Sequence, residues 1–200
     1  IIDCTGDADI VHFTGAKYVT NANKDRMAVT SVFNCSGVDK EKFINYTEKE
    51  KKTYNDWGSD WNQTTTDKEK NLRSPYLGPE FKDAAEKGII DKSNNSISGS
   101  WSSINEMGEA TNLNLVHMKG YDCTNVEDIT KAEIEGRKKT METIEALKKC
   151  VPGFEKAALR NFSMTLGTRD SRKIVGEYNL TKEDVMNQAR FKDSIGIFPE

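Results

Sequence analysis

The chain has 200 residues, of which 36% are hydrophobic, and it carries a formal net charge of −3 with a mean hydropathy of −0.71. Such a chain can build one domain with its own core, although much of it must lie at the surface. The acidic balance and the lack of a basic tract argue against a nucleic-acid-binding protein, and no apolar run reaches the roughly 20 residues that cross a bilayer. No secretory signal opens the chain, so we expect a cytoplasmic protein with no membrane partner.

The first residues predict a strand, a tight turn and a helix. Ile1–Cys4 is a short apolar strand, and Gly6 permits a sharp turn after it. Asp7 or Asp9 can cap a helix that we expect from Ala8 to Ala16. Because the first residue is not Met and the strand is already under way, we expect the chain to be part of a longer protein.

The middle of the chain carries alternating strand and helix signals. β-branched and aromatic residues predict strands, and polar segments with spaced aromatic residues predict helices. The region between Asn55 and Ser100, which includes Trp57 and Trp61, shows only weak secondary-structure patterns. In chain order, the predicted elements are strand Met27–Cys35, helix Asp39–Tyr54, helix Phe81–Lys87, strand Ile97–Ile104 and strand Leu113–Met118. We expect the last two strands to share one antiparallel sheet.

The clearest helix signal runs from Thr130 to Cys150. Thr130 and Glu133 can form a capping box, in which the two side chains satisfy free backbone N–H groups. Apolar and small residues recur at helical spacing and predict one buried stripe, whose small middle lets another element approach closely. The stripe comprises Ile129, Ala132, Gly136, Thr140, Ile144 and Leu147. Pro152-Gly153 ends the helix.

The last predicted elements are a strand from Ser163 to Leu166 and a helix that Thr181 opens and that reaches about Arg190. Helices and antiparallel strands in separate runs indicate an α+β fold. We therefore expect an antiparallel or mixed sheet packed against helices.

Neither the cysteines nor the acidic residues predict a metal site. The four cysteines are widely spaced and form no Cys-x-x-Cys pair, which favours small buried residues over zinc ligands or disulfides. Asp3, Asp7 and Asp9 do not fit the spacing of a calcium loop. A strand, a glycine, an aspartate and a helix fit a nucleotide site better, because a tight turn lets backbone amides and a carboxylate contact a phosphate or a sugar hydroxyl.

The segment from Gly167 to Thr181 is the strongest functional signal. It holds two arginines, Arg169 and Arg172, between glycines, and it ends on a helix start. Arginine is always charged and offers a planar fork of donors that suits a carboxylate, a phosphate or a developing oxyanion. The alternative is a solvated strand whose arginines pair with Asp170 or Glu177.

His117 is the second candidate for chemistry. It lies near the end of a predicted strand, and histidine can carry a proton near neutral pH. A hydrogen-bonded packing residue is the alternative. His12 lies beside the first turn, and we expect it only to pack on the first helix.

These segments, in this order along the chain, resemble the FAD-dependent oxidoreductase family, a branch of the two-dinucleotide-fold flavoproteins. The turn at Cys4-Thr5-Gly6-Asp7 resembles the second flavin motif, usually Ala-Thr-Gly-Asp. The arginine block and Leu180-Thr181-x-x-Asp184 are the most specific parts of the resemblance, and Lys173 departs from it where a third arginine is common. Other similar segments are Ile129–Arg137, Val151–Glu155 and Phe191–Ile195.

The resemblance implies three parts of the chain. Residues 1–20 are the tail end of an FAD-binding domain, residues 21–166 a substrate or cap domain, and residues 167–200 the arginine segment with a return toward the FAD-binding domain. In the family, the glycine-rich pyrophosphate turn lies upstream of such a segment. The rest of the FAD-binding domain is therefore an expected partner in the parent chain, and the isolated chain should bind FAD weakly and be inactive.

The resemblance also implies site residues and an activity. Thr5, Gly6 and Asp7 would face FAD, while Arg169 and Arg172 would position a small-molecule substrate or stabilise an oxyanion, with His117 as a proton carrier. Hydride transfer between an organic substrate and FAD is the expected reaction of the intact protein. The alternative is a stand-alone α+β module that binds a ligand or a partner without catalysis.

Overall fold

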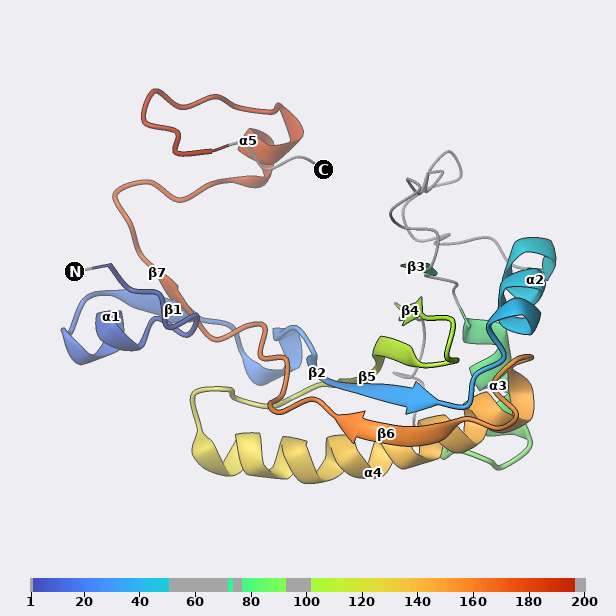
Figure 1. The fold of residues 1–200 in the computed structure, drawn as a ribbon. Coiled ribbons are helices and arrows are strands. Elements are labelled where there is room, and N and C mark those ends of the chain that lie inside the picture. Colours follow the sequence, from blue (N-terminus) through green and yellow to red (C-terminus); the bar gives the residue numbers. More distant parts are fainter. Residues whose placement is uncertain (1, 51–71, 74–76, 93–101, 197–200) are drawn as a thin grey trace. The chain divides into compact units, whose positions relative to one another are not determined.

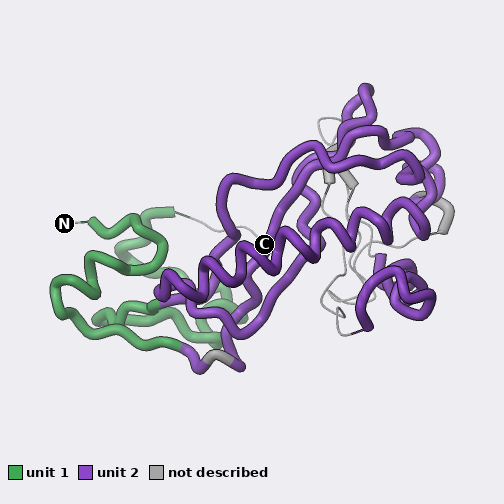
Figure 2. Tube along the Cα trace, turned by 90° about the horizontal axis from the view of Figure 1, so that it is seen from below, with its two compact units in different colours: residues 1–20, 172–200 green, residues 21–171 purple. Residues whose placement is uncertain are grey.

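The computed structural model describes residues 2–50, 72–73, 77–92 and 102–196. The chain forms two compact units, which Figure 2 colours separately. Unit 1 combines Ile1–Thr20 with Arg172–Glu200, and unit 2 comprises Asn21–Ser171. Trp57, Trp61 and the first part of the predicted strand Ile97–Ile104 lie outside the described residues. The mixture of helices and antiparallel strands confirms the predicted α+β class.

Unit 2 is built on a five-stranded sheet in which every pairing is antiparallel. The strand order is β3-β4-β5-β2-β6, so β2 lies between β5 and β6. The bounds are β2 Val29–Ser36, β3 Leu72–Arg73, β4 Ser102–Ile104, β5 Ala110–Met118 and β6 Ala158–Phe162. The predicted strand Ser163–Leu166 is therefore wrong by several residues. The chain after β6 keeps only isolated backbone bonds to β2, at Ser163 and Gly167.

Helix α4, Val126–Cys150, covers one face of this sheet (Figure 1). It starts one turn earlier than predicted, because Asn125 is the N-cap and its side chain accepts hydrogen bonds from the backbone of Glu127 and Asp128. The predicted capping box is wrong: the Thr130 hydroxyl instead donates to the Val126 carbonyl inside the helix.

The predicted stripe of α4 does face the sheet. Ala132, Gly136, Thr140, Ile144 and Leu147 are buried, and Ile129 is half-buried against the same core. A Cβ placed on Gly136 would lie 3.0 Å from both Met118 Cε and Ser31 Cβ. The small middle of the helix thus lets β2 and β5 approach closely, as the spacing predicts.

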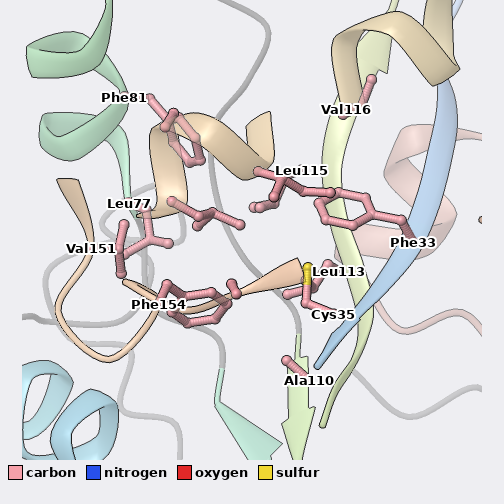
Figure 3. Close-up of a cluster of buried hydrophobic side chains, with 14 of the residues drawn as sticks. Phe33, Cys35, Leu77, Phe81, Ala110, Leu113, Leu115, Val116, Val151 and Phe154 are labelled. Atoms are coloured by element: carbon pink, nitrogen blue, oxygen red, sulfur yellow. The ribbon is translucent and has the colours of Figure 1, made fainter. Parts of the chain in front are cut away.

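The core of unit 2 consists of buried side chains from the helices and from the strands of the sheet (Figure 3). Phe33, Phe43 and Phe154 are fully buried, and the rings of Phe43 and Phe154 meet edge to face with centroids 5.0 Å apart. Phe43 lies on α2, Lys40–Glu50, and Phe154 follows α4. Helix α3, Gly78–Glu86, adds Phe81 and begins at Gly78-Pro79 rather than at Phe81, because proline suits the first helical turn.

Unit 1 contains a two-stranded antiparallel ladder between β1, Tyr18–Thr20, and β7, Arg172–Ile174, with the short helix α1, Asp9–Phe13 (Figure 1). The ladder was not among the predicted elements. Helix α5, Lys182–Met186, begins after Thr181 as predicted and has a capping box between Thr181 and Asp184, although it ends before Arg190.

Helix α1 is shorter than the predicted Ala8–Ala16, and its N-cap is neither Asp7 nor Asp9. Ala8 holds that position with φ of 52°, in the left-handed region, and offers no side-chain cap.

The described residues contain no disulfide, no cluster of metal ligands and no membrane-spanning helix. All four cysteines are free; Cys35 and Cys123 are buried as predicted, whereas Cys4 is exposed. In the part of the chain that the structure describes, no group of three or more His, Cys, Asp or Glu residues could hold a metal ion. Within the same ranges, no helix has both the length and the apolar character needed to cross a membrane.

Candidate functional site

The turn at Thr5–Asp7 is fixed by two side chains at its own start. The Asp3 carboxylate accepts hydrogen bonds from the Thr5 backbone and hydroxyl through Oδ1, at 2.9 and 2.7 Å, and from the Val11 backbone through Oδ2, at 3.1 Å. Thr5 Oγ1 in turn accepts the Asp9 N–H at 2.9 Å. The bonds from Thr5 lower the pKa of Asp3, because they favour its charged form. Asp3 and Thr5 thus replace the predicted helix cap.

The outer part of this turn is open. Gly6 has φ of 82°, and no heavy atom beyond its chain neighbours lies within 4 Å of the position that a Cβ would take. The half-buried Asp7 side chain makes no hydrogen bond or ion pair with another described residue. A backbone that tolerates close approach and a carboxylate without a partner in the described part of the chain can both serve a ligand.

Arg172 lies on the same turn, although it is far from it in sequence. Its Nη1 donates to the Asp7 carbonyl at 3.0 Å and to Asp9 Oδ1 at 2.6 Å. The guanidinium also lies over the Tyr18 ring, with Cζ 5.7 Å from the centroid, and the side chain is only 10% exposed. The structure therefore joins one predicted arginine to the predicted flavin turn, within unit 1.

Arg169 is in a different environment, in unit 2. It is exposed, and it makes no hydrogen bond or ion pair with any residue that the structure describes. Asp170, considered above as its partner, is buried and accepts hydrogen bonds from the Asn21 side chain at 2.8 Å and the Met27 backbone at 3.1 Å. Arg169 is thus an available cation rather than half of a surface ion pair with Asp170.

The backbone on the other side of Arg169 is held as well. Gly167 and Thr30 exchange two backbone hydrogen bonds, with N–O distances of 2.8 and 3.1 Å. Thr30 is also the register partner of His117 on β5. His117, Thr30 and Gly167 therefore lie in one row across neighbouring strands, and Arg169 follows two residues after the row ends. The strand that carries His117 and the arginine segment, which were predicted separately, thus both pair with β2 at this end of the sheet.

A side chain at position 167 should destabilise this row. A Cβ on Gly167 would lie 2.2 Å from Thr30 Oγ1, so we expect Gly167→Ala to lower the free energy of unfolding by about 1–3 kcal/mol through overpacking. Urea denaturation followed by circular dichroism measures the change. Thr30→Ala should reduce the loss when it is combined with Gly167→Ala, and Gly196→Ala, which adds its Cβ to open space, serves as the neutral control. Equal stability of Gly167→Ala and wild type would contradict this packing.

His12 lies within α1 and is exposed, and it contacts Tyr18 of β1 rather than only packing on the first helix. Its Nδ1 lies 3.1 Å from the Tyr18 hydroxyl, and the two rings meet edge to face. Tyr18 itself is a part of the site that the sequence did not predict, since no local pattern links it to Arg172. Asp170 was considered only as an arginine partner, and nothing in its spacing pointed to Asn21 or Met27.

Comparison with known proteins gives one match. No curated protein and no solved structure matches this sequence. The family model described as FAD dependent oxidoreductase matches residues 1–199, almost the whole chain. The chain therefore belongs to the FAD dependent oxidoreductase family.

Proposed function

We propose that this chain is the substrate-side part of a flavoenzyme that transfers a hydride between an organic substrate and FAD. FAD, when bound, supplies the hydride-accepting or hydride-donating chemistry. The residues of unit 1 fit one side of such a cofactor, because the turn is open at Gly6 and Asp7 has no protein partner among the described residues. In this proposal the Asp7 carboxylate accepts hydrogen bonds from FAD hydroxyl groups.

The contrast between the two arginines carries the substrate side of the proposal. Arg172 is bonded to the turn and 10% exposed, whereas Arg169 is exposed and without a partner in the described part of the chain. A guanidinium with no carboxylate partner among the described residues, on a backbone fixed at Gly167 and Asp170, is suited to bind an anionic group of a substrate. We therefore assign substrate binding to Arg169.

His117 supplies a group that can take up or release a proton. It is half-buried on β5 and shares a row with Thr30 and Gly167. Oxidation of an alcohol or amine releases a proton besides the hydride, and an imidazole with a pKa near neutrality can receive it. In this proposal His117 has that role, and Arg169 orients the substrate.

The chain lacks one feature that tight FAD binding needs. Its sequence contains no Gly-x-Gly-x-x-Gly turn, the motif that places a pyrophosphate on a helix N-terminus. We therefore expect residues 1–200 alone to bind FAD weakly, and the cofactor-loaded form to require the rest of the FAD-binding domain from the parent protein.

Flavin binding by the full-length protein tests the proposal. The purified protein should show the visible absorption of bound flavin, and Asp7→Asn should weaken FAD binding about 10-fold or more, because it removes a charged hydrogen-bond acceptor. Quenching of flavin fluorescence gives the dissociation constants. Asp25→Asn, which changes an exposed carboxylate in unit 2, is the control and should bind FAD like the wild type. A colourless protein, or an unchanged constant in Asp7→Asn, would contradict the assignment.

A further inference from the structure

We infer that Arg172 is a positioning residue for the flavin-facing turn and not a substrate ligand. This inference rests on the proposed function of the turn, because a role in cofactor binding requires that Asp7 meets FAD. It gives the two arginines of one short segment different partners: Arg169 a substrate, and Arg172 the protein's own backbone.

The contacts of Arg172 are made with other parts of the protein, and they hold its side chain in place. One guanidinium nitrogen, Nη1, bonds both the Asp7 carbonyl and the Asp9 carboxylate. The guanidinium lies over Tyr18, and the backbone of Arg172 is paired with Thr20 in the β1–β7 ladder. A side chain held by a carbonyl, a carboxylate, an aromatic ring and its own strand has little freedom to follow a substrate.

The backbone that Arg172 holds needs an external bond. Asp3 and Thr5 fix the start of the turn and the N–H groups of Asp9 and Val11, but neither contacts the peptide that joins Asp7 to Ala8. That peptide precedes Ala8, which has φ of 52°, a region that residues with a Cβ enter at an energetic cost. The bond from Arg172 to the Asp7 carbonyl opposes relaxation of Ala8.

The position of the Asp7 side chain depends on this bond. The Asp7 carbonyl carbon and side chain are both bonded to the Asp7 Cα, so a bond that holds the carbonyl also limits displacement of that Cα and of the carboxylate. Because the Asp7 side chain has no partner of its own among the described residues, its orientation depends on the backbone. Arg172 thus sets where a ligand finds the Asp7 carboxylate, without touching the ligand.

Flavin binding by full-length variants tests this role. Arg172→Ala should raise the dissociation constant for FAD about 10-fold or more, and Arg172→Lys should lie between it and wild type, because lysine keeps the charge without the planar fork. Asp9→Asn should have a smaller effect, since the bond to the Asp7 carbonyl remains. Arg190→Ala removes an exposed arginine of the same unit and should bind FAD like wild type.

A second substitution separates positioning from a general loss of stability. Ala8→Gly should change little in wild type but should restore part of the FAD affinity of Arg172→Ala, because glycine adopts the left-handed conformation without strain. Thermal denaturation of the same variants shows whether each one folds. Lack of rescue in a folded Arg172→Ala, Ala8→Gly protein would overturn the inference.

The remaining outcomes distinguish this inference from the proposed function. If Asp7→Asn binds FAD normally, the turn does not meet the cofactor and both ideas fail. If Asp7→Asn weakens binding while Arg172→Ala does not, the positioning role alone is wrong. If Arg172→Ala binds FAD like wild type but no longer binds the small carboxylates that perturb the wild-type flavin spectrum, Arg172 is a substrate ligand.

Discussion

Replacing Arg169 with alanine is expected to lower kcat/KM for reduction of the enzyme-bound flavin by roughly 100-fold or more, at unchanged FAD affinity. Arg169 is exposed and has no partner among the described residues, so its removal should leave the fold within about 0.5 kcal/mol of wild type. The loss should therefore appear in turnover alone. Anaerobic bleaching of the flavin by a panel of small carboxylates and phosphate esters identifies a substrate and measures the rate.

Two variants control this prediction. Arg169→Lys keeps the charge but not the bidentate geometry, so its rate should fall between those of wild type and Arg169→Ala. Arg160→Ala removes an exposed arginine of the same unit that pairs with Glu109 at 3.0 Å, and it should turn over normally. Full activity in Arg169→Ala would contradict the assignment of substrate binding to Arg169.

Replacing His117 tests its proposed role as the proton carrier. If His117 receives a proton, His117→Gln should lower the rate of flavin reduction while leaving binding of a substrate carboxylate to Arg169 intact. The register places His117, Thr30 and Gly167 in one row, and Arg169 lies two residues beyond Gly167, so the effects of the two substitutions on one substrate can be compared directly. Non-additive losses in the double variant would indicate that they act on the same molecule.

Elements with strong local signals were predictable from the sequence. The stripe of α4 and the start of α5 after Thr181 depend on residues three or four apart, and both are present as predicted. The start of α4 was predicted one turn late, because Thr130 and Asn125 can both cap a helix. An earlier start keeps Ile129 helical and packed against the core, which favours Asn125.

Pairings between distant segments could not be predicted in this way. The β1–β7 ladder joins the first residues of the chain to the arginine segment, and each strand has only three residues. Such short strands carry little periodicity, and they are stable through their partner rather than through their own sequence. For the same reason, the bond from Arg172 to the Asp7 turn is a property of the fold that neither segment shows alone.

In the candidate site, too, local patterns were predictable from the sequence and contacts between distant segments were not. The sequence predicted the Thr5–Asp7 turn and both arginines, since glycine and arginine in these patterns carry specific chemistry. It gave both arginines one role, because nothing local distinguishes them. The distinction comes from the tertiary structure, which buries Arg172 against Tyr18 and leaves Arg169 exposed.

The largest loss of stability is expected in the core of unit 2, at Phe154. The ring is fully buried and meets Phe43 at an interplanar angle of 80°, an edge-to-face arrangement. Phe154→Ala should lower the free energy of unfolding by about 3–5 kcal/mol, because it removes a large apolar surface and leaves a cavity. Urea denaturation measures this change, and Phe13→Ala, at a ring that is 79% exposed, should have almost no effect.

The cost of Phe154→Ala also depends on the backbone around it. Gly153 has φ of 95°, and its carbonyl accepts the Asp39 N–H at 2.8 Å, so the chain that carries Phe154 is tied to the start of α2. A rigid connection limits how far the core can collapse into a cavity, which places the expected loss toward the upper end of its range. Phe154→Leu fills most of the cavity and should lose clearly less. If the alanine and leucine variants were equally stable, the cavity would not account for the loss, because both substitutions remove the ring that meets Phe43 and only leucine fills most of the space.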